Sequence, residues 1–190
     1  MNIYLDLDDV LCDFVGAALK LHGWTRPQWE AVQERGRWEM LTALGMTIDQ
    51  FWQPIHDAGE AFWVNLEEKV HFRQLLALAD HYGGAGNWHI ATSPSYSPSS
   101  YSGKARWIKD RLGFQFNRII PIAHKYLLAN ERSLLIDDRA DNVFDFIHHG
   151  GKGIIFPAIQ NCLHEHSANP IPYVAQKLQE LTSCTSAFGT

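Results

Sequence analysis

An apolar stretch that ends in three acidic residues, close to the start of the chain, constrains the fold more than any other feature. Residues 3–5 are apolar, and Asp6, Asp8 and Asp9 follow before the chain becomes apolar again. Such a run is typical of a strand buried on both faces of a parallel sheet. Asp6 and Asp8 are two residues apart, so in extended chain their side chains point the same way. Two carboxylates directed at one place repel each other, and we therefore expect a hard divalent cation between them.

The rest of the chain alternates short apolar runs with segments of helical spacing. We expect further strands at residues 88–91, 118–122, 133–136 and 153–156, and helices at residues 14–21, 70–82, 104–112, 141–148 and 171–181. This alternation predicts an α/β fold, a Rossmann-like doubly wound and mostly parallel five-stranded sheet. The carboxyl ends of its strands would share one edge, where such folds bind ligands.

One segment, residues 23–65, differs in character from the rest. It contains five of the seven tryptophans and shows no strand-like alternation, so we expect a small helical insertion with helices at residues 26–35 and 47–58. The expected division is a core of residues 1–22 and 66–182, the insertion at 23–65, and a tail at 183–190. Residues 93–103, rich in Ser, Tyr and Pro, are expected to form a loop.

Charge and cysteine content exclude several classes of function. The formal net charge of −5 and the lack of a long basic run argue against binding to a nucleic-acid backbone. No apolar run approaches the length that crosses a bilayer, and the start lacks a secretory signal, so we expect no membrane and a cytoplasmic location.

The odd number of cysteines (Cys12, Cys162 and Cys184) argues against a disulfide scaffold. Acidic neighbours would raise the pKa of the Cys12 thiol, which argues against a nucleophile there. The sequence leaves the oligomeric state open, with a homodimer as one possibility.

Residues suited to phosphoryl transfer stand at or after four of the expected strands. They are Asp6, Asp8, Thr92, Lys125, Asp137 and Asp138. In a doubly wound sheet these places can meet at one edge. A carboxylate nucleophile, a second carboxylate for proton transfer, a hydroxyl, a lysine and acidic ligands for Mg²⁺ together favour phosphate-ester hydrolysis.

In these motifs the chain resembles the haloacid-dehalogenase-like (HAD) phosphohydrolases. The motifs read Tyr4-Leu5-Asp6-Leu7-Asp8, Ile90-Ala91-Thr92-Ser93, His124-Lys125 and Leu134-Leu135-Ile136-Asp137-Asp138. Within that superfamily the chain is most similar to the 5′(3′)-deoxyribonucleotidases, through residues 8–14, Thr92-Ser93-Pro94 and residues 135–139. The resemblance implies an Mg²⁺-dependent phosphatase of nucleoside 5′-monophosphates, with deoxyribonucleotides favoured, and a helical cap at 23–65 over the active site.

The resemblance also implies roles for the acidic residues. Asp6 would attack phosphorus and form an aspartyl-phosphate. Asp8 would protonate the leaving oxygen and then deprotonate the hydrolytic water, while its backbone carbonyl binds the metal. Asp6 and Asp138 would supply carboxylate ligands to Mg²⁺, with Asp137 close by through water or a hydrogen bond.

Thr92, with Ser93 beside it, and Lys125 would hold the transferring phosphoryl oxygens. Lys104 is a rival for the lysine role, because it opens an expected helix and could approach a phosphate from there. The family resemblance favours Lys125, which follows the third strand and precedes the acidic pair.

Substrate contacts follow less directly. Phe14 matches an aromatic residue of the family, and Phe62 and Trp63 stand where the insertion rejoins the core; all three are candidates to enclose a base, by stacking or packing. Tyr96 and Arg139 are further candidates, Tyr96 at a place where many deoxyribonucleotidases carry a basic residue. Ser93 completes the expected set of substrate-binding residues.

Two departures and two alternatives stand beside this interpretation. Asp9 occupies a place where the family usually has glycine, and residues 93–103 differ from the family's loop. One alternative keeps the chemistry but changes the substrate to another small phosphate ester or a polynucleotide 3′-phosphate. The other is a non-catalytic nucleotide-binding module, against which the presence of both Asp6 and Asp8 argues.

Overall fold

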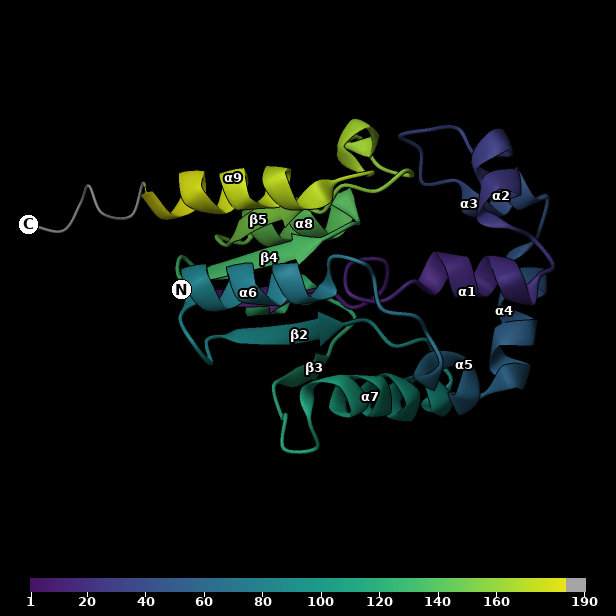
Figure 1. Cartoon of the computed structure of the whole chain (residues 1–190), viewed down its shortest axis with the longest axis horizontal. Helices are drawn as coiled ribbons and strands as arrows, with labels where there is room; N and C mark the ends of the chain where they lie inside the picture. Colours follow the sequence, from purple (N-terminus) through teal and green to yellow (C-terminus); the bar gives the residue numbers. More distant parts are fainter. Residues whose placement is uncertain (184–190) are drawn as a thin grey trace, which may run out of the picture.

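A single parallel sheet forms the centre of the structure. The computed structural model describes residues 1–183, and within them five strands lie in the order β3-β2-β1-β4-β5, every neighbouring pair parallel (Figure 1). The strands are β1 (Asn2–Leu5), β2 (Trp88–Thr92), β3 (Ile119–Pro121), β4 (Ser133–Asp137) and β5 (Lys152–Ile155). This confirms the predicted α/β sheet, which is parallel throughout rather than mostly parallel. Pro121 lies in the edge strand β3, where its missing N–H breaks no ladder between central strands.

Helices cover both faces of the sheet. On one face α6 (Phe72–Gly83), α7 (Pro98–Leu112) and α9 (Pro170–Ser183) bury alternate strand residues, among them Ile3, Leu5 and Ile90. On the other face α8 (Ala140–His148) packs Phe146 against Tyr4 and neighbouring strand residues. Successive strand residues point to opposite faces, so a strand covered on both sides needs apolar residues at successive positions, as residues 3–5 of β1 and 134–136 of β4 are.

The chain reverses direction across the sheet between β1 and β4. From β1 it adds β2 and then β3 on one side, and it returns to place β4 and β5 on the other side. The neighbours β1 and β4 therefore form the topological switch point, where the crevice of a doubly wound sheet binds its ligand.

Short helices follow β1 and gather beyond the carboxyl ends of the strands, at the right of Figure 1. They are α1 (Phe14–Leu21), α2 (Arg26–Val32), α3 (Met40–Leu44), α4 (Ile48–Ala58) and α5 (Glu60–Val64). Capping boxes start two of them: Thr25 pairs with Gln28 in α2, and Thr47 pairs with Gln50 in α4. Residues 23–65, the helical segment, thus contain helices and no strand, as the sequence predicted.

Some predicted boundaries differ from the structure. The loop prediction for residues 93–103 is wrong from Pro98 onward, because α7 begins there with Pro98 in its first turn, where a missing N–H costs nothing. Gly103 lies inside this helix because α5 packs closely on it: a Cβ at Gly103 would lie 2.5 Å from that of Trp63. Likewise α6 starts at Phe72 and leaves Val70 fully exposed, whereas the sequence predicted a helix from residue 70.

Two further ends were also misplaced. Helix α2 stops at Val32, before the predicted residue 35, because Gln33 is extended. Helix α9 continues to Ser183, so the expected tail at 183–190 overlaps it by one residue, and residues 184–190, with Cys184, lie outside the described residues.

The two short 3-10 helices are η1 (Lys125–Leu128) and η2 (His164–His166). Across the described residues, no helix combines the length and apolar character needed to traverse a membrane.

Candidate active site

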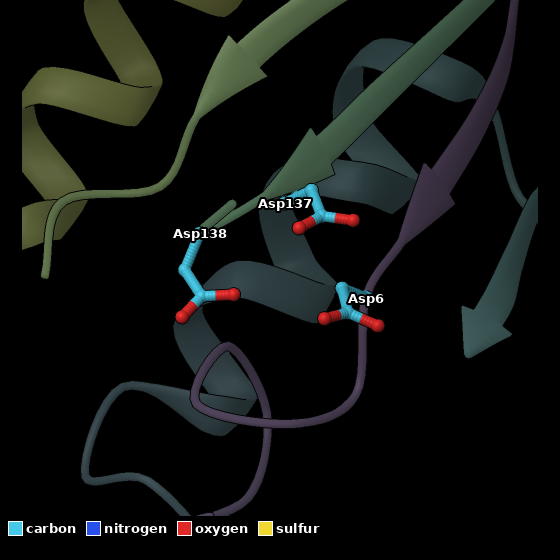
Figure 2. Close-up of side chains that lie close together, drawn as sticks. All are labelled: Asp6, Asp137 and Asp138. Carbon is cyan, nitrogen blue, oxygen red and sulfur yellow. The ribbon is translucent and has the colours of Figure 1, made fainter. Parts of the chain in front are cut away.

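Three carboxylates meet at the switch point of the sheet. Asp6 directly follows β1, Asp137 ends β4, and Asp138 comes next in the chain (Figure 2). One oxygen atom from each lies within 4.8 Å of the others, and no other such group of His, Cys, Asp or Glu occurs in residues 1–183. All three side chains are buried. The acidic residues at the ends of β1 and β4 therefore lie together, as the sequence predicted.

A buried lysine balances part of this negative charge. Lys125, in η1, places its Nζ 2.6 Å from Asp6 Oδ1 and 2.5 Å from Asp137 Oδ2. Asp137 also accepts hydrogen bonds from the Arg139 N–H and from Asn142 Nδ2, at 2.9 Å each. Asp137 is therefore fully satisfied by protein groups, which fits a supporting position beside a metal rather than a direct ligand.

Asp138 lacks such a partner. Gln160 Nε2 donates to its Oδ2 at 3.3 Å, and no ammonium or guanidinium group lies within ion-pair distance of it in the described chain. Burial raises the pKa of Asp138 well above its usual value, and the neighbouring carboxylates of Asp137, Asp9 and Asp6 raise it further. To stay ionised at neutral pH, a carboxylate in this position needs a cation, and oxygen ligands are those that Mg²⁺ prefers. The donor set thus fits the magnesium ion that the sequence predicted.

The same imbalance acts on Asp6. Burial raises its pKa to about 7, although Lys125 opposes that shift. A divalent cation at the three carboxylates would lower the pKa and keep Asp6 ionised at neutral pH. Lys125 itself stays charged, because Asp6 and Asp137 outweigh the effect of its burial and raise its pKa.

A second cation–carboxylate pair stands beside the first. Lys104 Nζ, from α7, lies 2.5 Å from Asp8 Oδ2 and donates to Thr92 Oγ1 at 3.0 Å and to the Ser93 carbonyl at 2.9 Å. Its side chain is 2% exposed. The structure therefore brings Lys104 to the same edge as Lys125 but gives each its own carboxylate: Lys104 pairs with Asp8, and Lys125 with Asp6.

Lys104 was only a rival candidate in the sequence, because residues 93–103 were assigned to a loop. Had Pro98 been taken as the first turn of α7, Lys104 would have fallen in the second turn of a helix that starts near the end of β2. That position directs a long side chain back to Thr92, the last residue of the strand.

A tight loop carries Asp8. The N–H groups of Leu11 and Cys12 both donate to the Leu7 carbonyl, at 2.9 and 3.0 Å, and the N–H of Asp9 donates to the Cys12 carbonyl at 2.8 Å. Cys12 is buried within this loop, and burial together with Asp8 and Asp9 raises the pKa of its thiol well above the usual value. The thiol is thus unsuited to act as a nucleophile, as the sequence predicted.

A cavity of about 580 Å³ opens above these groups, within the range of small-molecule sites. At its polar end lie Asp6, Asp8, Lys125 and Asp138. The opposite wall comes largely from α1 and the helical segment, and it consists of aromatic and other side chains: Phe14, Trp29, Trp38, Glu39, Met40, Leu41, Thr42, Phe51 and Trp52. The sequence pointed to Phe14; the stretch at residues 38–42 carries no motif and was missed.

The other predicted aromatic contacts lie elsewhere. Phe62 and Trp63 are buried behind Phe14, with ring centroids 5.9 and 5.7 Å from it, and neither borders the cavity. Trp63 also lies under the ammonium of Lys104, 4.9 Å from ring centre to Nζ. These two residues therefore pack against side chains of the site, Phe14 and Lys104, without bordering the cavity themselves.

Of the remaining predicted contacts, two border the cavity and one does not. Ser93 borders it, although its hydroxyl donates to the Ile122 carbonyl at 3.0 Å. Arg139 borders it and stacks its guanidinium on Trp38 at 5.6 Å. Tyr96 is 82% exposed, its hydroxyl bonded to His56 Nδ1 at 3.1 Å, and it lies away from the cavity.

Comparison with known proteins adds the fold family. No family model and no curated protein sequence matches the chain. Among solved structures, a haloacid dehalogenase-like family hydrolase from Xanthomonas campestris is 16% identical with a TM-score of 0.53, covering 98% of this chain and 93% of that one. A HAD family hydrolase from Deinococcus radiodurans R1, solved with bound phosphate and sodium, is 14% identical with a TM-score of 0.51, covering 83% and 82%. The chain therefore has the fold of the HAD-family hydrolases.

Proposed function

We propose that the chain is an Mg²⁺-dependent phosphatase that hydrolyses nucleoside 5′-monophosphates, with deoxyribonucleotides favoured, through an aspartyl-phosphate intermediate. One observation carries the proposal: Asp6, Asp137 and Asp138 converge at the switch point, directly beneath a cavity that also reaches Asp8. A nucleophile, an acid–base group and ligands for a cation thus share one enclosed space.

In the proposed reaction a carboxylate oxygen of Asp6 attacks phosphorus while the bond from phosphorus to the ribose oxygen breaks. Asp8 donates its proton to that leaving oxygen, and the nucleoside departs as an alcohol. Asp8 then takes a proton from water, the water oxygen attacks the phosphorus of the aspartyl-phosphate, and inorganic phosphate leaves. Asp6 and the protonated Asp8 are restored.

The residues of the chain that would hold Mg²⁺ are Asp6, Asp138 and the backbone carbonyl of Asp8, with Asp137 in support. When bound, the ion would offset the negative charge of the phosphoryl oxygens. Asp137 keeps Lys125 and the start of α8 in place through the Arg139 N–H and Asn142.

The two lysines suggest a division of labour. Lys125 contacts the nucleophile Asp6, so it orients that carboxylate and faces the phosphoryl group as it arrives. Lys104 and Thr92 form the neighbouring donor pair, on the side of the acid–base residue Asp8. Ammonium and hydroxyl groups held in a buried place stabilise negative charge far better than they do in water.

The aromatic wall supports a nucleoside as the leaving group. Phe14, Phe51 and Trp52 pack with one another at centroid distances of 5.5 to 6.4 Å, and all three border the cavity. Stacking of a base on an aromatic face contributes about 1–3 kcal/mol. In this proposal residues 23–65 act as a cap that holds the nucleoside while the core carries out the chemistry.

A phosphate-release panel tests the proposal. Purified protein is assayed with deoxyribo- and ribonucleoside 5′-monophosphates, sugar phosphates and a 3′-phosphorylated oligonucleotide, each with Mg²⁺ and with EDTA. We expect Mg²⁺-dependent release that is fastest from deoxynucleotides, and its loss in Asp6→Asn. Comparable turnover of sugar phosphates or of the oligonucleotide would change the substrate class. Binding of nucleotides without any phosphate release would indicate a non-catalytic module.

A further inference from the structure

Asp9 has a backbone conformation that its neighbours do not share. Its φ is +56°, and among residues 1–183 it is the one residue other than glycine with a positive φ. Glycine adopts this conformation without strain, and Asp is among the few other residues that tolerate it. Asp9 is also buried, 7% exposed, which is an unfavourable place for a carboxylate without partners.

The side chain of Asp9 joins the two ends of the loop. Both of its oxygens accept the N–H of Val15, each at 3.2 Å, at the first turn of α1. The residue that begins α1, Phe14, receives no side-chain cap from Asp13. Asp9 therefore does the capping from five residues upstream of Phe14, and it closes the loop between Asp8 and the aromatic wall.

Lys69 ties the same carboxylate to the returning chain. Its Nζ lies 3.2 Å from Asp9 and 2.8 Å from Asp13, and its backbone N–H donates to the Leu11 carbonyl at 3.0 Å. Arg26, from α2, completes the cluster with Nη2 2.5 Å from Asp13. The cluster joins the segments that lead into and out of the helical segment.

Asp9 also lines two cavities. Like Gln160, it borders both the 580 Å³ cavity above the carboxylates and a second one of about 330 Å³, which Arg26 and Lys69 also line. Of the cations at the second cavity, Lys69 is paired with Asp9 and Asp13, and Arg26 is paired with Asp13, so the charge of these two is directed at the loop.

We propose that Asp9 is a positioning residue that fixes Asp8 and Phe14 relative to each other across the active-site cavity. Asp8 immediately precedes it, and Phe14 immediately precedes the Val15 N–H that it binds. The inference rests on the proposed function, because it assigns Asp9 to the placement of the acid–base group. Displacing that group by a fraction of its hydrogen-bond length slows proton transfer to the leaving oxygen while the attack by Asp6 stays intact.

Two substrates separate positioning from folding. Thymidine 5′-monophosphate has an alkoxide leaving group that needs a proton, whereas the p-nitrophenolate of p-nitrophenyl phosphate leaves without one. For Asp9→Gly, which relaxes the backbone and removes the carboxylate, we expect kcat/KM to fall about 100-fold for thymidine 5′-monophosphate and about threefold for p-nitrophenyl phosphate. Asp9→Asn retains an acceptor for the Val15 N–H and should recover about half of the loss on a logarithmic scale.

Lys69→Met serves as the second approach should Asp9→Gly fold poorly, since it leaves Asp9 in the chain but removes its cation. It should shift the ratio of the two kcat/KM values in the same direction as Asp9→Asn. An equal loss with both substrates, or an unchanged ratio in Asp9→Asn and Lys69→Met, would overturn the role assigned to Asp9. If the unmodified protein hydrolyses neither substrate, the proposed function itself fails.

Discussion

The buried ammonium of Lys104 pairs with Asp8, Nζ to Oδ2 2.5 Å, although the two residues are far apart in the chain and the Asp8 side chain is 25% exposed. The ammonium also donates to Thr92 and lies over the ring of Trp63. Lys104 is the partner that depends on this pair, because loss of Asp8 would leave its ammonium buried without a carboxylate. The pair therefore links the packing of α5 on α7 to the group that is proposed to move the proton.

Removing that ammonium tests its part in catalysis. Lys104→Met should lower kcat/KM for a nucleoside monophosphate about 100-fold, the usual effect of deleting one preorganised donor at a transition state. Lys109→Met on the same helix is the matched control, since its Nζ lies near Phe114, 3.2 Å from the carbonyl and 4.8 Å from the ring centre, and not near the carboxylates of the site. Steady-state phosphate release measures both. Equal activity of the two variants would show that the ammonium of Lys104 takes no part in catalysis.

Magnesium should stabilise the folded protein even when substrate is absent. A ligand that binds only the folded state adds about 2.7 kcal/mol to the free energy of unfolding at a concentration 100 times its dissociation constant. Thermal unfolding followed by circular dichroism, with MgCl₂ against EDTA, should show a Tm that rises with Mg²⁺ concentration. A Tm that does not change with Mg²⁺ concentration would argue against a metal at the three carboxylates.

Asp138→Asn should raise the stability of the metal-free protein and remove most of the stabilisation by Mg²⁺. Without metal, the amide removes a buried carboxylate whose pKa is raised by burial and by neighbouring acids, so unfolding should cost about 1 kcal/mol more than in the parent protein. With Mg²⁺ the variant should gain little. Asp141→Asn, at an exposed position three residues on, is the control and should keep the parent's response. Lower stability of Asp138→Asn in EDTA would contradict this account.

Phe14 offers a test of the aromatic wall. Phe14→Leu retains apolar volume but removes the aromatic face, and we expect KM for a deoxynucleoside monophosphate to rise about tenfold, in line with a stacking contribution of 1–3 kcal/mol. Turnover of p-nitrophenyl phosphate should change far less. Phe114→Leu, at a side chain that is 79% exposed, should alter neither value. A uniform loss for both substrates would mean that Phe14 acts through packing.

His71 predicts a pH dependence of stability. Burial lowers its pKa from the usual 6.5, and Lys69 lowers it further, although the hydrogen bond from Nε2 to the Val10 carbonyl opposes this. The folded state keeps His71 neutral at a pH where the unfolded chain binds a proton. Stability is therefore complete above pH 6.5 and falls by about 1.4 kcal/mol for each pH unit below it, until the folded pKa is reached.

His71→Gln retains a side-chain donor for the Val10 carbonyl without titrating, so its stability should depend less steeply on pH between the two pKa values. His81→Gln, at an exposed position on α6, should follow the parent protein. Urea unfolding from pH 7.5 down to pH 5 measures all three, and parallel curves would show that another group is responsible.

The sheet and its acidic edge were predictable because they depend on short-range patterns. Short, largely apolar runs of three to four residues that are followed by Asp or Thr predicted β1, β2 and β4. The parallel arrangement then placed Asp6 beside Asp137 without further information. Such inferences need only the period of a strand and the rule that its carboxyl ends share an edge.

What was missed depends on contacts between distant segments. Lys104 and Lys125 are both lysines that follow strands, and only the packing of α5 on α7 at Gly103 shows how close Lys104 comes to Asp8. The different positions of Phe14, which borders the cavity, and of Phe62 and Trp63, which do not, have the same origin. All three are aromatic, and only the folded structure shows which of them is buried away from the cavity. A linear sequence does not state which of several similar side chains faces the cavity.

The position of β1 between β2 and β4 has a consequence for the order of assembly. Asp6 is among the first residues of the chain to be synthesised, but the strand that brings it Asp137 and Asp138 comes after two thirds of the sequence. Closing so long a loop costs chain entropy before any contact repays it. A nascent chain can therefore contain Asp6 and its helical segment long before the three carboxylates that could hold a metal come together. We therefore expect hydrolytic activity to appear late in folding and in a single step, when β4 pairs with β1.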